Sequence, residues 1–178
     1  MRIIRGRCVL LDANVVIALH AAGLWDRLVV SCEVIVPETV AEESRFHSVD
    51  LGGFSSPIDL YAEAEAERIE LVSASAQDVL DIQAHFASWF LDLVHPGELE
   101  SLAVLLSPEL TECEFCTADA AAIRAAALLG LGERCVCLKE LLDGIGLGRD
   151  LGKQFRPEFL GQFLEAGRTD RLRGFGLA

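Results

Sequence analysis

The sequence predicts an α/β protein, a three-layer α/β/α sandwich with a central, mostly parallel sheet. In residues 7–14, a run of apolar side chains ends at Asp12, and such a continuous run is typical of a strand buried on both faces. The pattern recurs in residues 113–119, where a second strand-like run ends at Asp119. A helical segment follows each Asp, and this alternation of strands and helices favours a parallel sheet with helices on both faces.

Helix-start and turn residues divide the rest of the chain into elements. Pro37 closes one strand and suits the first position of the next helix, and Ser75 with Asp78 resembles a capping box. The expected strands are residues 8–11, 34–37, 68–72, 113–118 and 136–138. The expected helices are residues 15–22, 24–30, 38–47, 58–67 and 75–93, a helix beginning at Pro96, and residues 120–129 and 139–142. Residues 48–57, rich in Gly and Ser, are expected to form a loop.

Charge and hydropathy limit the classes of function. The chain of 178 residues carries a formal net charge of −13, which argues against wrapping of nucleic acid by a basic surface. No stretch reaches the roughly 20 apolar residues that span a bilayer. The basic N-terminus is followed by an apolar run that Asp12 and Asn14 interrupt, so we do not expect a signal peptide. These features predict a soluble cytoplasmic protein without membrane partners.

The six cysteines allow two interpretations. Cys113 and Cys116 form a CxxC pair and Cys135 and Cys137 a CxC pair, which is the spacing of zinc ligands. Cysteine is also a small apolar residue, and Cys8, like most of the others, falls within a strand-like run. A cytoplasmic location disfavours structural disulfides. We therefore expect reduced, buried thiols on neighbouring strands.

Four carboxylates stand out by position. Asp12 and Asp119 are expected at one edge of the sheet, because the carboxyl ends of parallel strands meet there. Glu43 lies on the apolar face of its helix, and Glu98 lies in the first turn of the helix that Pro96 opens. Clustered carboxylates repel one another unless some are protonated, and a divalent cation removes this conflict. Mg²⁺ prefers oxygen ligands, and metal-activated water suits phosphodiester hydrolysis.

Alternatives remain open at two of these positions. Glu42 points about 100° away from Glu43 around the helix, and Glu100 lies near Glu98 in the same helix. The helix dipole alone favours an acid in a first turn. The sequence therefore does not decide between Glu42 and Glu43, or between Glu98 and Glu100.

Four segments in order give the chain a resemblance to the PIN domain family: LLDANVVI, VPETVAEE, HPGELESLAVLL and FCTADAAAIRAA, within residues 7–142. That family includes metal-dependent ribonucleases and the toxins of bacterial toxin–antitoxin pairs. The resemblance implies an RNA substrate, Mg²⁺ or Mn²⁺ as cofactor, and an antitoxin protein as a partner. It also implies a metal-binding quartet supported by two polar side chains: Asp12, Glu43, Glu98, Asp119, and Asn14 with Thr117.

The C-terminal region lies outside this resemblance. We predict a PIN-like domain of residues 1–148 and a helical extension of residues 149–178. The extension has a charge of +2, which leaves −15 for the other 148 residues. Phe155, Phe159 and Phe163 recur every four residues, as on one face of a helix. We expect this face to pack on the domain or on a partner, for example in a homodimer, rather than to serve as a free nucleic-acid arm.

Two other functions remain as alternatives to a ribonuclease. One is a catalytically inactive PIN-like module that binds protein. The other is a receiver-like or phosphatase-like flavodoxin variant, which is disfavoured because the first strand lacks paired acids and no suitable Lys follows a later strand. Metal-dependent cleavage of RNA separates these classes.

Overall fold

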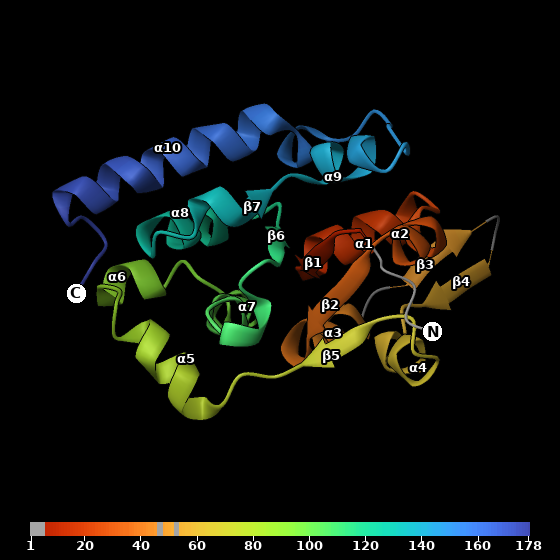
Figure 1. The fold of residues 1–178 in the computed structure, drawn as a ribbon, viewed down its shortest axis with the longest axis horizontal. Coiled ribbons are helices and arrows are strands. Elements are labelled where there is room, and N and C mark those ends of the chain that lie inside the picture. The colour runs from red at the N-terminus through yellow and green to blue at the C-terminus, as the bar shows by residue number, and fades with distance from the viewer. Residues whose placement is uncertain (1–5, 46–47, 52–53) are drawn as a thin grey trace.

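The computed structural model describes residues 6–45, 48–51 and 54–178 (Figure 1). Its centre is a sheet of five parallel strands in the order β5-β2-β1-β6-β7. The strands are β1 (Cys8–Leu11), β2 (Glu33–Pro37), β5 (Glu70–Val72), β6 (Glu114–Cys116) and β7 (Cys135–Val136). Helices flank both faces of the sheet, so the predicted α/β/α sandwich is confirmed.

The helices follow the order that the sequence predicts, with some differences in their ends. They are α1 (Ala13–Ala21), α2 (Trp25–Ser31), α3 (Glu38–Arg45), α4 (Leu60–Glu65), α5 (Ala76–Gln83), α6 (Ser88–Leu91), α7 (Pro96–Leu105), α8 (Ala120–Leu128), α9 (Leu138–Gly144) and α10 (Pro157–Arg173). Short 3-10 helices are η1 (Pro108–Leu110), η2 (Gly132–Arg134) and η3 (Lys153–Phe155).

Alternate residues of the central strands build two separate cores. Val9 and Leu11 of β1 pack with side chains of α1, α2, α3 and α9 on one face of the sheet. Leu10 of β1 and Phe115 of β6 pack with α5, α6, α7 and α8 on the other. Both faces of β1 are therefore buried, which explains why its sequence is a continuous apolar run rather than an alternating one.

The strand order places a natural crevice beside β1. From β1 the chain proceeds to β2 and β5 on one side of the sheet, and then crosses to β6 and β7 on the other side. The direction of winding thus reverses between β1 and β6. In open parallel sheets, ligands bind outside the carboxyl ends of the strands at such a switch point.

Two expected elements are wrong. Residues 48–57 are not a loop, since they contain an antiparallel hairpin of β3 (Ser48–Leu51) and β4 (Phe54–Pro57). The helix expected over 75–93 is broken into α5 and α6, because Phe86 forms a bridge with Leu177 from the far end of the chain. A further expectation, that α3 extends to His47, lies outside the described residues.

The C-terminal helix α10 lies along α8 (Figure 1). Leu160 is buried against Ile123 of α8, and Phe159 and Phe163 pack beside them with ring centroids 4.7 Å apart. Phe155 belongs instead to η3 and packs on the core of α1 and α9, because Pro157 begins α10 two residues later. Only Phe159 and Phe163 of the three predicted phenylalanines therefore share one helix face.

All six cysteines are free thiols, and Cys8 and Cys135 are partly exposed while the other four are buried. Among the described residues, no single helix is long and apolar enough to cross a membrane, although α1 and α2 reach that length together across a bend of 117°.

Candidate active site

Asp12 ends β1 and caps α1. Its Oδ1 accepts a hydrogen bond of 2.8 Å from the backbone N–H of Val15, so the side chain satisfies a free donor in the first turn of α1. Its Oδ2 accepts hydrogen bonds from the Thr117 hydroxyl and, at 3.3 Å, from the backbone N–H of Ala118. Burial raises the pKa of Asp12 to about 6, and these hydrogen bonds oppose that rise because they stabilise the charged form.

Thr117 connects Asp12 to Asp119. Its hydroxyl oxygen accepts a hydrogen bond of 3.1 Å from the backbone N–H of Asp119, and the same hydroxyl donates a hydrogen bond to Oδ2 of Asp12. Asp119 caps α8, and its Oδ1 accepts hydrogen bonds from Ala121 and Ala122 at 2.7 and 3.0 Å. One hydroxyl thus links the carboxylate of Asp12 to the backbone of Asp119, at the sheet edge where the sequence predicts both residues.

Glu98 occupies the first turn of α7 and is 8% exposed. Its Oε2 accepts a hydrogen bond of 2.9 Å from the backbone N–H of His95, which closes the N-terminus of the helix. Burial, followed by the negative charge of Asp119, raises the pKa of Glu98 to about 8, and the charge of Asp12 adds to the effect. Protonated Glu98 can donate a hydrogen bond to Asp119. Three of the predicted acids therefore interact electrostatically.

Glu43 reaches the same place from α3. It is half-buried, and its carboxylate lies over Gly97 in the first turn of α7, where an added Cβ would be 3.1 Å from Oε1. Any other residue at position 97 would crowd this carboxylate. Gly97 thereby allows Glu43 to approach the backbone beside Glu98, a function that the sequence analysis did not assign to this glycine.

These residues line one cavity of about 520 Å³. Asn14 stands at it from the first turn of α1, with an exposed side chain, and His95 and Thr39 also form part of the wall. All four predicted acids are in the lining: Asp12, Glu43, Glu98 and Asp119. Thr117 does not line the cavity but is buried behind it, where it bonds Asp12.

The sequence does not decide between Glu42 and Glu43 or between Glu98 and Glu100. The structure gives the two members of each pair different environments. Glu42 and Glu43 both line the cavity, but Glu43 is half-buried with its carboxylate against Gly97 of α7, whereas Glu42 is exposed. Glu100 is buried outside the cavity lining, and its two oxygens accept hydrogen bonds from the backbone N–H groups of Thr39 and Ala74 at 2.9 and 3.2 Å. Glu100 therefore joins α7 to the starts of α3 and α5.

The donor chemistry of the cavity fits a hard divalent cation. Its carboxylates supply oxygen ligands, and besides burial the negative charges of Asp119 and Asp12 raise the pKa of Glu98. Among the described residues, however, no three His, Cys, Asp or Glu side chains are already arranged closely enough to hold a metal ion. The arrangement is thus a carboxylate-lined cavity rather than a preformed coordination sphere.

Comparison with known proteins assigns no family. The chain matches no family model, and a search of curated proteins gave no significant match.

Proposed function

We propose that this protein is a Mg²⁺- or Mn²⁺-dependent ribonuclease of the PIN type. The observation that carries the proposal is the convergence of four carboxylates, from four different elements, on one cavity at the switch point of a parallel sheet. The order of motifs that resembles PIN ribonucleases favours RNA as the substrate. Carboxylate oxygens and substrate phosphate are the ligands that Mg²⁺ prefers in nucleic-acid enzymes.

In this proposal Asp12, Glu98 and Asp119 would hold the cation, with Glu43 beside Glu98 at the first turn of α7. A Mg²⁺ ion held there would keep several waters and take phosphate oxygens of the substrate as further ligands. A bound divalent ion lowers the pKa of water and neutralises charge on phosphate. Thr117 and the capping bonds fix the orientation of Asp12 and Asp119, and Asn14 stands at the cavity wall where it can hydrogen-bond the substrate.

The substitution Asp12→Asn tests this function. We expect it to abolish most Mn²⁺-dependent cleavage of a fluorescent RNA oligonucleotide and most of the rise in melting temperature that Mn²⁺ causes, because metal that binds only the folded state stabilises it by mass action. The metal-free variant should remain folded, since the amide oxygen can still cap α1 while a buried charge is lost.

Asp59→Asn is the matched control. Asp59 caps α4 through a similar hydrogen bond to Ala62 but lies outside the cavity, so this variant should keep both activity and the metal response. Cleavage that persists in EDTA, or that is the same in Asp12→Asn, would contradict the proposal. A purified protein that neither binds Mn²⁺ nor cleaves RNA or DNA would favour the inactive protein-binding module.

A further inference from the structure

A second cavity, of about 580 Å³, lies between α5, the C-terminal half of α7 and the end of β5. Its walls are apolar where the two helices face each other, with Ile82 of α5, Val104 of α7 and Val72 of β5 in the lining. Leu106 follows α7 at the cavity and leaves 47% of its surface exposed. Ile82 and Val104 are themselves buried, so the apolar surface open to a ligand is that of Leu106 with the partly exposed Val72 and Leu110. A groove between helices with exposed apolar side chains can receive a peptide that presents an apolar face.

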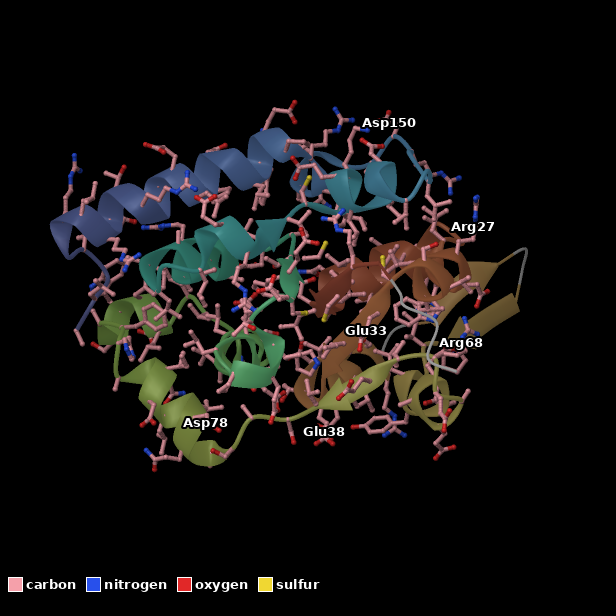
Figure 2. All side chains as sticks on the ribbon, viewed as in Figure 1. Arg27, Glu33, Glu38, Arg68, Asp78 and Asp150 are labelled. Atoms are coloured by element: carbon pink, nitrogen blue, oxygen red, sulfur yellow. The ribbon has the colours of Figure 1, made fainter. Side chains whose placement is uncertain are left out.

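The rim of this groove is acidic. Four exposed carboxylates belong to the lining, namely Glu70, Asp78, Asp81 and Glu109. None of the described residues in the lining is Lys or Arg. Asp78 accepts hydrogen bonds from the backbone N–H and the hydroxyl of Ser75, and Asp81 accepts one from the side-chain amide of Gln77. None of these donors carries a formal charge that would neutralise the carboxylates. Asp78 stands at the start of α5 on the outer surface (Figure 2).

Among the described residues, no ion pair joins a basic residue of the C-terminal tail to the four rim carboxylates. Arg168 of α10 pairs with Glu133, and Arg156 pairs with Asp150. The chain end reaches the edge of the groove, where the N–H of Ala178 donates to the carbonyl of His85 and Leu177 packs against the core on that side of the sheet. Arg156 and Arg168 are therefore paired away from the acidic rim.

We propose that this groove docks a cationic segment of a partner protein, one that carries Lys or Arg beside an apolar face. The apolar side chains of the segment would contact Val72, Leu106 and Leu110, and its cations would meet the four rim carboxylates. Nucleic acid is disfavoured because its phosphates would face these carboxylates. A second copy of this chain, with its net charge of −13, is disfavoured for the same reason.

This site is separate from the proposed metal site. The acidic cavity lies at the N-terminus of α7 and the groove at its C-terminal half, and the six residues from Glu98 to Val104 correspond to about 9 Å at 1.5 Å per residue. The docking proposal therefore does not depend on nuclease activity, and Asp12→Asn should bind the partner segment as the original protein does.

The test is fluorescence anisotropy of the full chain with a labelled, short amphipathic peptide of leucine and lysine. A scrambled peptide of the same composition, which lacks an apolar face, should bind at least about tenfold more weakly. Leu106→Asp and the double variant Asp81→Lys with Glu109→Lys should each weaken binding of the amphipathic peptide by about tenfold or more, because they place an unpaired charge in the groove or reverse its rim.

Two matched variants control for overall charge and surface hydrophobicity. Glu65→Lys with Glu165→Lys makes the same change in net charge at exposed positions outside the groove, and Leu172→Asp removes an apolar side chain that is 90% exposed on α10. Both should bind the peptide like the original protein. Equal loss in the control variants, equal binding of the scrambled peptide, or no binding of either peptide would overturn the proposal. A Leu106-dependent dimer in sedimentation would assign the groove to self-association instead.

Discussion

Glu98 and Glu100 lie two residues apart in α7, and both are 8% exposed, yet their environments differ. Burial disfavours the charged form of Glu98, and the negative charges of Asp119 and Asp12 add to this effect. Glu100 points away from these aspartates, and its two oxygens accept hydrogen bonds from the backbone N–H groups of Thr39 and Ala74. The partners of Glu100 are 61 and 26 residues away in the chain, so no local pattern could have identified its structural role.

Glu98→Gln should remove part of the pH dependence of stability of the metal-free protein. The folded-state pKa of Glu98 is about 8, well above its ordinary value of 4.5, so folding favours the protonated form. This contribution to the free energy of unfolding is complete below about pH 4.5 and is lost as pH rises through about 8. It is on the order of a few kcal/mol, since each pKa unit corresponds to about 1.4 kcal/mol.

Urea denaturation at several pH values in EDTA measures this effect. The free energy of unfolding of the original protein should fall between about pH 5 and 8 relative to that of Glu98→Gln, which has no titrating group at this position. Two curves that run parallel over this range would show that Glu98 is not protonated in the fold.

Several residue-scale features of the site could be predicted because their signals are local. Asp12 and Asp119 each end an apolar run, and the side chain of each caps the next helix as such positions favour. The role of Gly97 was missed, although a glycine in the first turn of a helix, where other residues form helices better, was the available signal. The long-range hydrogen bonds of Thr117 depend on the pairing of β1 with β6 and could not be read from either segment alone.

At the scale of elements, the contact between α8 and α10 depends on a glycine. Gly167 faces α8 so closely that an added Cβ would lie 2.6 Å from the Cβ of Ala127 and 2.8 Å from the carbonyl oxygen of Arg124. Gly161, in the same helix, has nothing within 4 Å of such an atom. The two positions therefore form a matched pair for the packing of this helix.

Gly167→Ala should destabilise the protein by about 1–3 kcal/mol, because the extra methyl group would force the helices apart. Gly161→Ala should stabilise it by up to about 1 kcal/mol, because alanine favours the helix and meets no obstacle. Thermal unfolding of both variants in the same buffer measures the difference. Stabilisation by both substitutions would indicate that α10 does not rest on α8 in solution.

The elements that the sequence analysis missed were of two kinds. The hairpin of β3 and β4 had a local signal, since two short segments stand on either side of Gly52 and Gly53, a pair typical of hairpin turns. The break between α5 and α6 had none, because it is fixed by pairing of Phe86 with Leu177, and the backbone N–H of Ala87 donates to the carbonyl of Gly176. Helical periodicity does not report such a contact with a distant segment.

At the scale of the whole molecule, the C-terminal extension covers an apolar side of the domain. Ile123 of α8 is fully buried beneath Leu160, and the aromatic ring of Phe175 lies against that of Trp89 on α6, with centroids 4.8 Å apart. Opposite charges also meet across this contact, since Arg124 pairs with Asp170 and Arg168 with Glu133. The extension thus covers the apolar surface of α6 and α8, whereas a free nucleic-acid arm would leave that surface exposed to solvent.

Truncation after Gly148 should therefore expose apolar surface and cost stability. Fully burying one large aliphatic side chain contributes about 1.5–3 kcal/mol, so the loss of several such contacts amounts to several kcal/mol. We expect residues 1–148 to melt at a lower temperature and to aggregate, as measured by calorimetry and light scattering. In the full chain, Leu160→Ala should cost about 2–5 kcal/mol because Leu160 is 6% exposed. Leu172→Ala, at 90% exposure, should change little. If the truncated protein were equally stable and monodisperse, with only its salt-dependent affinity for RNA reduced, the extension would be a nucleic-acid arm.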